Sequence, residues 1–210
     1  MTSPEVIAAV KIPELIDAGR WMSERGFLPA TSGNLSCRLT PAHVAVTASG
    51  GDKGALREDD ILVADIAAAP PSRASAETPL HLQLYRDLPG CGAVLHGHSL
   101  MSTLLSQARA DQDALLLSGY ELLKAFAGVR SHDTVIEVPL IANSQDMDGL
   151  AAQVAARLSQ HRPGARLAPC YLLVGHGFYA WGDTLAEARR HVEALDFLLT
   201  CEWEKARTRP

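Results

Sequence analysis

Two histidine motifs constrain the fold of this chain more than any other feature of its sequence. His96-Gly97-His98 ends one apolar stretch, and Gly175-His176-Gly177 directly follows another at 171–174. Side chains two residues apart on a strand point to the same face, so His96 and His98 can bind one ion. A divalent ion such as zinc needs three or four ligands. His176 is the candidate third ligand, since flanking glycines let the backbone turn and the ring project. The prediction requires two strands far apart in the sequence to end side by side.

The alternative, that these are ordinary histidines at strand ends, stays open. The remaining histidines carry no such pattern. His81, four residues after Glu77, is expected to be a helix neighbour rather than a ligand. The others lie in polar or helix-surface contexts, where we expect no ligand role: His43, His132, His161 and His191.

Strands and helices are predicted to mix without strict βαβ alternation. The clearest helix is the last, which Thr184 caps with Glu187 three residues on, and its apolar face is Leu185, Ala188, Val192, Leu195 and Leu199. Ser118 with Glu121 predicts a similar N-cap for a helix over 118–126. Other helices are expected over 14–22, 78–86 and 99–107, and strands over 34–39, 43–48, 61–64, 93–96, 134–138 and 171–174. This pattern favours a mixed sheet covered by helices in layers, and no linker divides the single expected domain, 1–210.

Composition excludes several classes of function. The net charge is −5 and no Lys/Arg cluster is present, which argues against nucleic-acid binding. No run of 18 apolar residues exists, so no membrane span is expected. The first eleven residues lack the pattern of a signal peptide. The four cysteines lie far apart without a C-x-x-C motif, which predicts reduced thiols and a cytoplasmic protein.

Two carboxylates are candidates for acid/base chemistry at the metal site. Glu77 begins the helix before the His-x-His strand, and Glu121 lies in the helix predicted after it. A general acid or base needs a carboxyl within reach of the substrate and a pKa raised by burial. Both residues also have a purely structural interpretation, Glu77 as a first-turn partner of the helix dipole and Glu121 as a capping-box residue.

Two polar, glycine-containing turns predict an anion site. They are Thr31-Ser32-Gly33-Asn34 and Ser49-Gly50-Gly51-Asp52-Lys53-Gly54. Such turns expose backbone N–H groups, to which hydroxyls and a lysine add donors. Neither is a Walker motif, and G-x-G-x-x-G is absent, which counts against a dinucleotide fold. Either turn could be structural, but together with a metal site they favour a small phosphorylated substrate, with Ser32, Gly33, Asn34, Ser49, Gly50 and Lys53 as candidate phosphate-binding residues.

In this order, the motifs resemble the class II aldolase/adducin family. The matching segments are 31–36, 47–50, 75–79, His96-Gly97-His98 and Gly175-His176-Gly177, and the resemblance covers about residues 10 to 205. Ser118-Gly119-Tyr120-Glu121-Leu122 and the tail over 179–195 are similar to a dehydratase branch of that family.

The resemblance implies a three-layer α/β/α fold with a mixed, largely antiparallel central sheet. It implies one zinc ion per subunit, held by His96, His98 and His176, a phosphorylated ketose substrate and usually a homotetramer. Glu121 matches the acid/base of the dehydratase branch. The position of Glu77 carries a catalytic or metal-capping glutamate in aldolases and a cysteine in some dehydratases, so its role stays open.

Two alternatives remain beside dehydration. The same metal chemistry would serve a sugar-phosphate aldolase or epimerase. A non-enzymatic, adducin-like interaction module is the third possibility, although a scaffold has no need for an open metal site.

Overall fold

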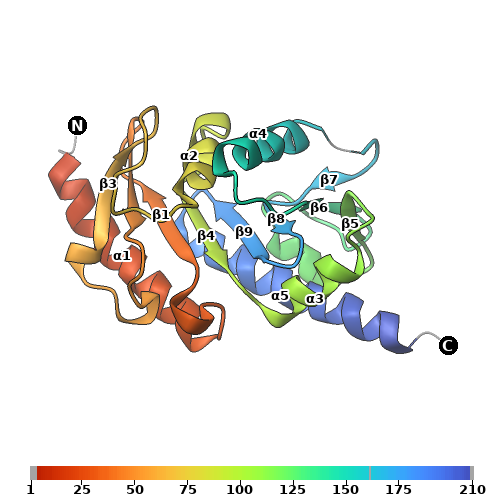
Figure 1. Ribbon diagram of the computed structural model, residues 1–210. Coiled ribbons are helices and arrows are strands. Elements are labelled where there is room, and N and C mark those ends of the chain that lie inside the picture. Colours follow the sequence, from red (N-terminus) through yellow and green to blue (C-terminus); the bar gives the residue numbers. More distant parts are fainter. Residues whose placement is uncertain (1–3, 161, 209–210) are drawn as a thin grey trace.

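A continuous mixed sheet forms the centre of the computed structural model, which describes residues 4–160 and 162–208 (Figure 1). The strand order is β3-β2-β1-β4-β9-β8-β6-β5, with β7 beside β6. Pairing is antiparallel throughout, except that β6 runs parallel to β7 and β8. The strands are β1 (Asn34–Arg38), β2 (His43–Thr47), β3 (Ile61–Asp65), β4 (Ala93–Gly97), β5 (Ala114–Leu117), β6 (Ile136–Ile141), β7 (Arg166–Leu167), β8 (Cys170–Leu173) and β9 (Gly177–Gly182). The predicted mixed, largely antiparallel sheet is confirmed.

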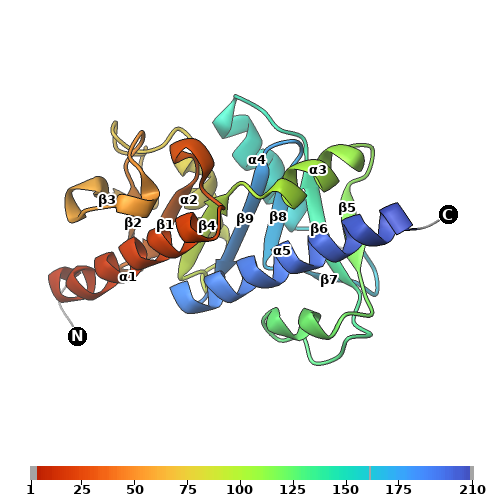
Figure 2. The same cartoon turned by 90° about the horizontal axis from the view of Figure 1, so that it is seen from below.

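Helices cover both faces of the sheet. On one face lie α1 (Pro4–Glu24), α3 (Leu100–Ala108) and α5 (Leu185–Thr208), seen in front of the strands in Figure 2. On the other lie α2 (Thr78–Asp87) and α4 (Met147–Leu158). Each face has its own buried apolar cluster, one beneath α1, α3 and α5 and the other beneath α2 and α4. The predicted three-layer α/β/α arrangement is therefore confirmed.

The predicted start of the last helix is also correct. The Thr184 hydroxyl accepts a bond of 3.1 Å from the Glu187 amide, and the Glu187 carboxylate accepts one of 2.9 Å from the Asp183 amide. Burial of Val192, Leu195 and other residues of its apolar face then ties α5 to the sheet.

The helix predicted over 118–126 is wrong. The chain forms only a 3-10 helix, Glu121–Ala125, and its N-cap residue, Tyr120, makes no side-chain capping bond. Gly119 has φ +83°, a left-handed conformation that an α-helix cannot contain. Ser118 therefore cannot act as the N-cap of a helix that includes Glu121. The sequence patterns also missed α4, β5, β7 and β9, although Asp146 caps α4 by accepting a bond of 3.0 Å from the Gly149 amide.

The remaining predictions have mixed outcomes. The prediction that His191 lies on a helix surface is wrong. The side chain is fully buried, with Nδ1 2.6 Å from the Trp181 carbonyl and Nε2 accepting from the Ala127 amide. His161 lies outside the described residues. None of the helices in the described ranges has both the length and the apolar character to cross a membrane. All four cysteines are free thiols, and three of them are buried.

Candidate metal centre

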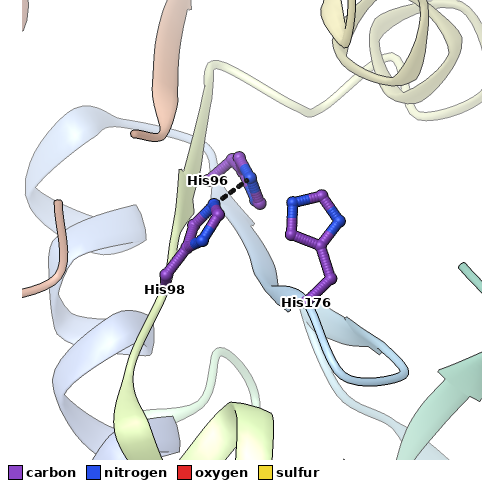
Figure 3. A group of neighbouring side chains, drawn as sticks. All are labelled: His96, His98 and His176. Carbon is purple, nitrogen blue, oxygen red and sulfur yellow. Dashed lines mark hydrogen bonds between the residues drawn. The ribbon is translucent and has the colours of Figure 1, made fainter. Parts of the chain in front are cut away.

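Three histidines from two distant segments converge at one point. His96 lies on β4, His98 directly follows it, and His176 lies in the turn between β8 and β9. Antiparallel pairing of β4 with β9 sets Gly97 opposite Phe178, which brings the two motifs together. One ring nitrogen from each histidine lies within 4.8 Å of the others (Figure 3). The arrangement has the size of a mononuclear metal site.

Glycine makes this approach possible. A Cβ atom at Gly177 would lie 2.4 Å from the Gly97 carbonyl oxygen, so any larger residue there would push the two histidine turns apart. The sequence signal, a histidine flanked by glycines, therefore has a steric cause as well as a conformational one.

Hydrogen bonds orient the rings. His96 donates from Nδ1 to the Phe178 carbonyl at 2.8 Å, and His176 from Nδ1 to Asn143 Oδ1 at 3.3 Å. The rings of His96 and His176 therefore direct Nε2 into the cluster, which is how metal-binding histidines are usually held. Burial, with a contribution from His96, lowers the pKa of His98 to about 4 and also lowers the pKa of His176. At neutral pH both rings are uncharged and able to bind a metal.

Glu77 completes the cluster. Its Oε2 lies 3.2 Å from His96 Nε2 and its Oε1 3.2 Å from His176 Nε2, and Asn34 donates to Oε2 at 2.7 Å. Burial alone would raise the pKa of Glu77, but its bonds and charge interactions with His96, His176 and Asn34 hold that pKa well below its ordinary value. The carboxylate is therefore anionic and lies against the Nε2 atoms of two imidazoles, and a divalent cation is the partner that would satisfy these groups together. The residues present fit a metal ion.

Lys53 joins the two predicted phosphate turns. Its Nζ donates to the Thr31 carbonyl at 3.2 Å and to the Gly51 carbonyl at 2.8 Å, so the turns lie side by side. The side chain is 3% exposed, and burial lowers its pKa. Lys53 therefore holds the two loops together, and its predicted contact with phosphate stays a prediction.

The other predicted phosphate residues take different positions. Ser49 and Gly50 are exposed, and Gly33, with φ +78°, packs near the His96 carbonyl. Ser32 Oγ is shielded from solvent without a hydrogen-bond partner among the described residues. Asn34 is buried, and its side-chain amide contacts Glu77 and Ser75 rather than solvent.

Glu121 lies in a different setting. Its side chain is 73% exposed and pairs with Lys124 and, at 3.7 Å, with His132. It lines an open hollow with Tyr120, Leu122 and Phe197, apart from the three histidines of its own chain. Of the two predicted acid/base carboxylates, the fold brings only Glu77 to the histidines.

Sequence reasoning missed the groups behind Glu77. His81 is fully buried and bonds through Nε2 to Asn34 Oδ1 and through Nδ1 to Ser36 Oγ. The signal was available: Glu77, His81 and Tyr85 recur every four residues on a helix, and Asn34 and Ser36 alternate on a strand.

Comparison with known proteins identifies the family of the chain. Residues 13–203 match the model of the class II aldolase and adducin N-terminal domain, and the chain belongs to this family. A methylthioribulose-1-phosphate dehydratase of Xanthomonas campestris pv. campestris (strain 8004) is 48% identical over 99% of the chain and 97% of its own length. A dehydratase of the same name from Bradyrhizobium sp. is 50% identical over 90% of the chain and 88% of its own length. The solved L-fuculose-1-phosphate aldolase of Thermus thermophilus shares the fold, with a TM-score of 0.70, 24% identity and coverage of 97% of this chain and 100% of its own.

Proposed function

We propose that this protein is a zinc-dependent hydro-lyase that removes water from 5-methylthioribulose 1-phosphate and forms 2,3-diketo-5-methylthiopentyl 1-phosphate, a step of methionine salvage. The substrate comes from the name that relatives about half identical to the chain carry. The observation that carries the proposal is the convergence of three imidazoles and one carboxylate at a single point.

We assign the metal to His96, His98 and His176. Three nitrogen ligands with further positions open to substrate are typical of catalytic zinc, one ion per subunit. Zinc bound there supplies Lewis-acid chemistry, which polarises a carbonyl and makes the neighbouring C–H more acidic.

The remaining work is proton transfer. A base takes the proton from C3, next to the C2 ketone, and an acid gives a proton to the C4 hydroxyl, which leaves as water; ketonisation then gives the diketone. A general base works best when its pKa is near the working pH. The pKa of each carboxylate is lowered in the single chain, that of Glu77, against the effect of burial, by His96, His176 and Asn34, and that of Glu121 by its bond with Lys124. Glu77 is the second candidate for these transfers because the cluster fixes it, whereas the exposed pair of Glu121 is readily exchanged. We assign them to Glu121.

Glu121 requires a second copy of the chain to reach a metal centre. It lies beside exposed apolar side chains, since Leu122 is 38% and Phe197 54% exposed. Contiguous exposed apolar surface is typical of an interface, and a homotetramer would place Glu121 of one copy in the site of its neighbour.

The two glycine turns are proposed to hold the phosphate, through Ser32, Gly33, Asn34, Ser49, Gly50 and Lys53. Ser32 Oγ lacks a partner among the described residues, and Ser49 and Gly50 are accessible. Of the other two polar side chains, Lys53 contributes by fixing the loops, and Asn34 by holding Glu77. Fixing the phosphate positions the reacting carbons and lowers the entropic part of the barrier.

Two broader assignments accompany this function. The sheet runs without a break from β3 to β5, which supports a single domain over 1–210. Free, buried thiols suit a reducing compartment, so we assign the protein to the cytoplasm.

A product assay tests the function. Purified protein loaded with zinc is incubated with 5-methylthioribulose 1-phosphate, and the products are separated by mass spectrometry. The proposal expects a product lighter by one water, and none from a His176→Ala control. Release of dihydroxyacetone phosphate from ketose 1-phosphates would instead indicate an aldolase. A protein that takes up no zinc and converts none of these substrates would favour the interaction module.

A further inference from the structure

A ladder of buried polar side chains runs away from the metal centre between β1 and α2. Asn34 and Ser36 point to one face of β1. Facing them are Glu77, the N-cap residue of α2, and His81 and Tyr85 on α2 itself. Two residues of strand advance about 6.6 Å and four residues of helix about 6 Å, so the two periods match and the side chains interleave.

We infer that this ladder is a hydrogen-bond relay that sets the orientation of the Glu77 carboxylate through the side-chain amide of Asn34. The relay consists of Tyr85, Ser36 and His81. These three are positioning residues, and the proposed function is needed only for the kinetic consequence of the relay, not for the relay itself.

The direction of each bond follows from the end near Glu77. The anionic carboxylate accepts from Asn34 Nδ2 at 2.7 Å, so Asn34 Oδ1 faces the other way, towards His81. Oδ1 can only accept, and His81 therefore carries its hydrogen on Nε2. Because the ring is fully buried and its pKa is lowered to about 3, chiefly by desolvation, it is neutral and Nδ1 is an acceptor.

The far end is then determined as well. Ser36 Oγ, 2.7 Å from His81 Nδ1, donates its hydrogen to that nitrogen. Its lone pair accepts from the Tyr85 hydroxyl at 2.9 Å. Arg38 closes the ladder, with its guanidinium 5.0 Å from the centre of the Tyr85 ring and bonded to the Tyr85 carbonyl. Every donor thus points towards Glu77.

The relay solves a specific problem at the metal centre. An asparagine amide has two ends of similar shape, and only the NH₂ end stabilises a carboxylate. Without His81 to donate to Oδ1, Asn34 could rotate and turn its oxygen on Glu77. Because Asn34, Ser36, His81 and Tyr85 are each 2% exposed or less, water cannot take over this role.

Imidazole nitrogen NMR tests the relay directly. In metal-free protein labelled with ¹⁵N-histidine at pH 7, His81 is expected to show a protonated Nε2 and a bare Nδ1. The His81→Gln spectrum assigns the signal, and Ser36→Ala is expected to shift the Nδ1 resonance. A His81 that is protonated on Nδ1, or doubly protonated, would overturn the inference.

Kinetics test its consequence. His81→Leu removes the donor, and we expect kcat per bound zinc to fall about 10- to 100-fold, as for other outer-shell hydrogen-bond partners at metal sites, with KM unchanged. His81→Gln keeps an N–H in reach of Asn34, and recovery of most of kcat is expected. Equal kcat for wild type and His81→Leu, or no recovery in a folded His81→Gln, would contradict the relay.

A matched pair of tyrosine variants tests the end of the relay that lies away from Glu77. Tyr85→Phe removes the hydroxyl that begins the relay, whereas Tyr171→Phe removes a buried hydroxyl without a hydrogen-bond partner among the described residues. We expect a lower kcat only for Tyr85→Phe; equal effects would remove Tyr85 from the relay. If the wild-type protein converts no ketose phosphate, the proposed function fails, and the NMR experiment still decides for or against the relay.

Discussion

Glu77 and Glu121 are the same residue type in opposite surroundings. Glu77 is 19% exposed and contacts His96, His176 and Asn34, all of them buried or partly buried. Glu121 is 73% exposed, and its partners Lys124 and His132 are about half exposed. The first carboxylate is fixed by its own chain, whereas an exposed ion pair such as the second is weak in water and readily exchanged.

Under the proposed function, this difference means that one chain builds only part of the catalytic site. The single chain supplies the histidine cluster, a carboxylate and the two glycine turns. An exposed carboxylate on an apolar surface gains a raised pKa and a fixed position only when another surface covers it. The contrast therefore predicts different behaviour for the two residues in mutants, mixtures and assemblies.

The largest expected effect is that of Glu77→Gln. The substitution keeps the shape but removes the charge from the cluster, and we expect kcat to fall by about 10²- to 10⁴-fold. Steady-state kinetics on zinc-loaded protein measures it, with the surface variant Glu204→Gln as a control expected to match wild type. A Glu77→Gln enzyme with normal kcat would make Glu77 a structural partner only.

Mixed oligomers test whether Glu121 acts in the site of a neighbouring copy. Glu121→Gln and His96→Ala are each expected to lower kcat by about 10²-fold when tested alone. If Glu121 serves the site of a neighbouring copy, co-refolding equal amounts makes about a quarter of the sites intact, and activity returns to that level. Activity that does not return on mixing, with both variants shown to assemble, would place Glu121 outside the neighbour's site.

The surroundings of Glu77 and of Glu121 also differ in how much of them the sequence could predict. The histidine cluster was predictable because strand alternation and flanking glycines are local signals that fix direction. The setting of Glu121 was not, because S-G-Y-E imitates a capping box and only the left-handed Gly119 breaks the helix. The spacings of His81 on its helix and of Asn34 on its strand are visible in the sequence. Their roles were missed because the packing of α2 on β1, a contact across 47 residues, is not a local signal.

A charge placed in the apolar hollow beside Glu121 tests whether this surface is an interface. Phe197→Lys puts an ammonium where we expect the second copy to pack, and it should lower the assembly state and, with it, kcat. Val63 is equally exposed, at 54%, but lies on the edge strand β3, so Val63→Lys is the matched control. Light scattering and kinetics measure both. Intact assembly of Phe197→Lys would show that this hollow is not the interface.

The smallest expected effect is on stability, and it comes from the buried His81. Burial lowers the pKa of His81 from 6.5 to about 3, so below pH 6.5 the unfolded chain binds a proton that the folded chain does not. Stability is therefore lost as pH falls from 6.5 towards 3, and at pH 5 the loss from this residue is about 2 kcal/mol relative to pH 7. Urea unfolding of metal-free protein at both pH values measures the loss, and in His81→Gln the fall between pH 7 and pH 5 should be smaller by that amount. The same fall in both proteins would mean that His81 takes up its proton while folded, which the closed packing around β1 and α2 does not allow.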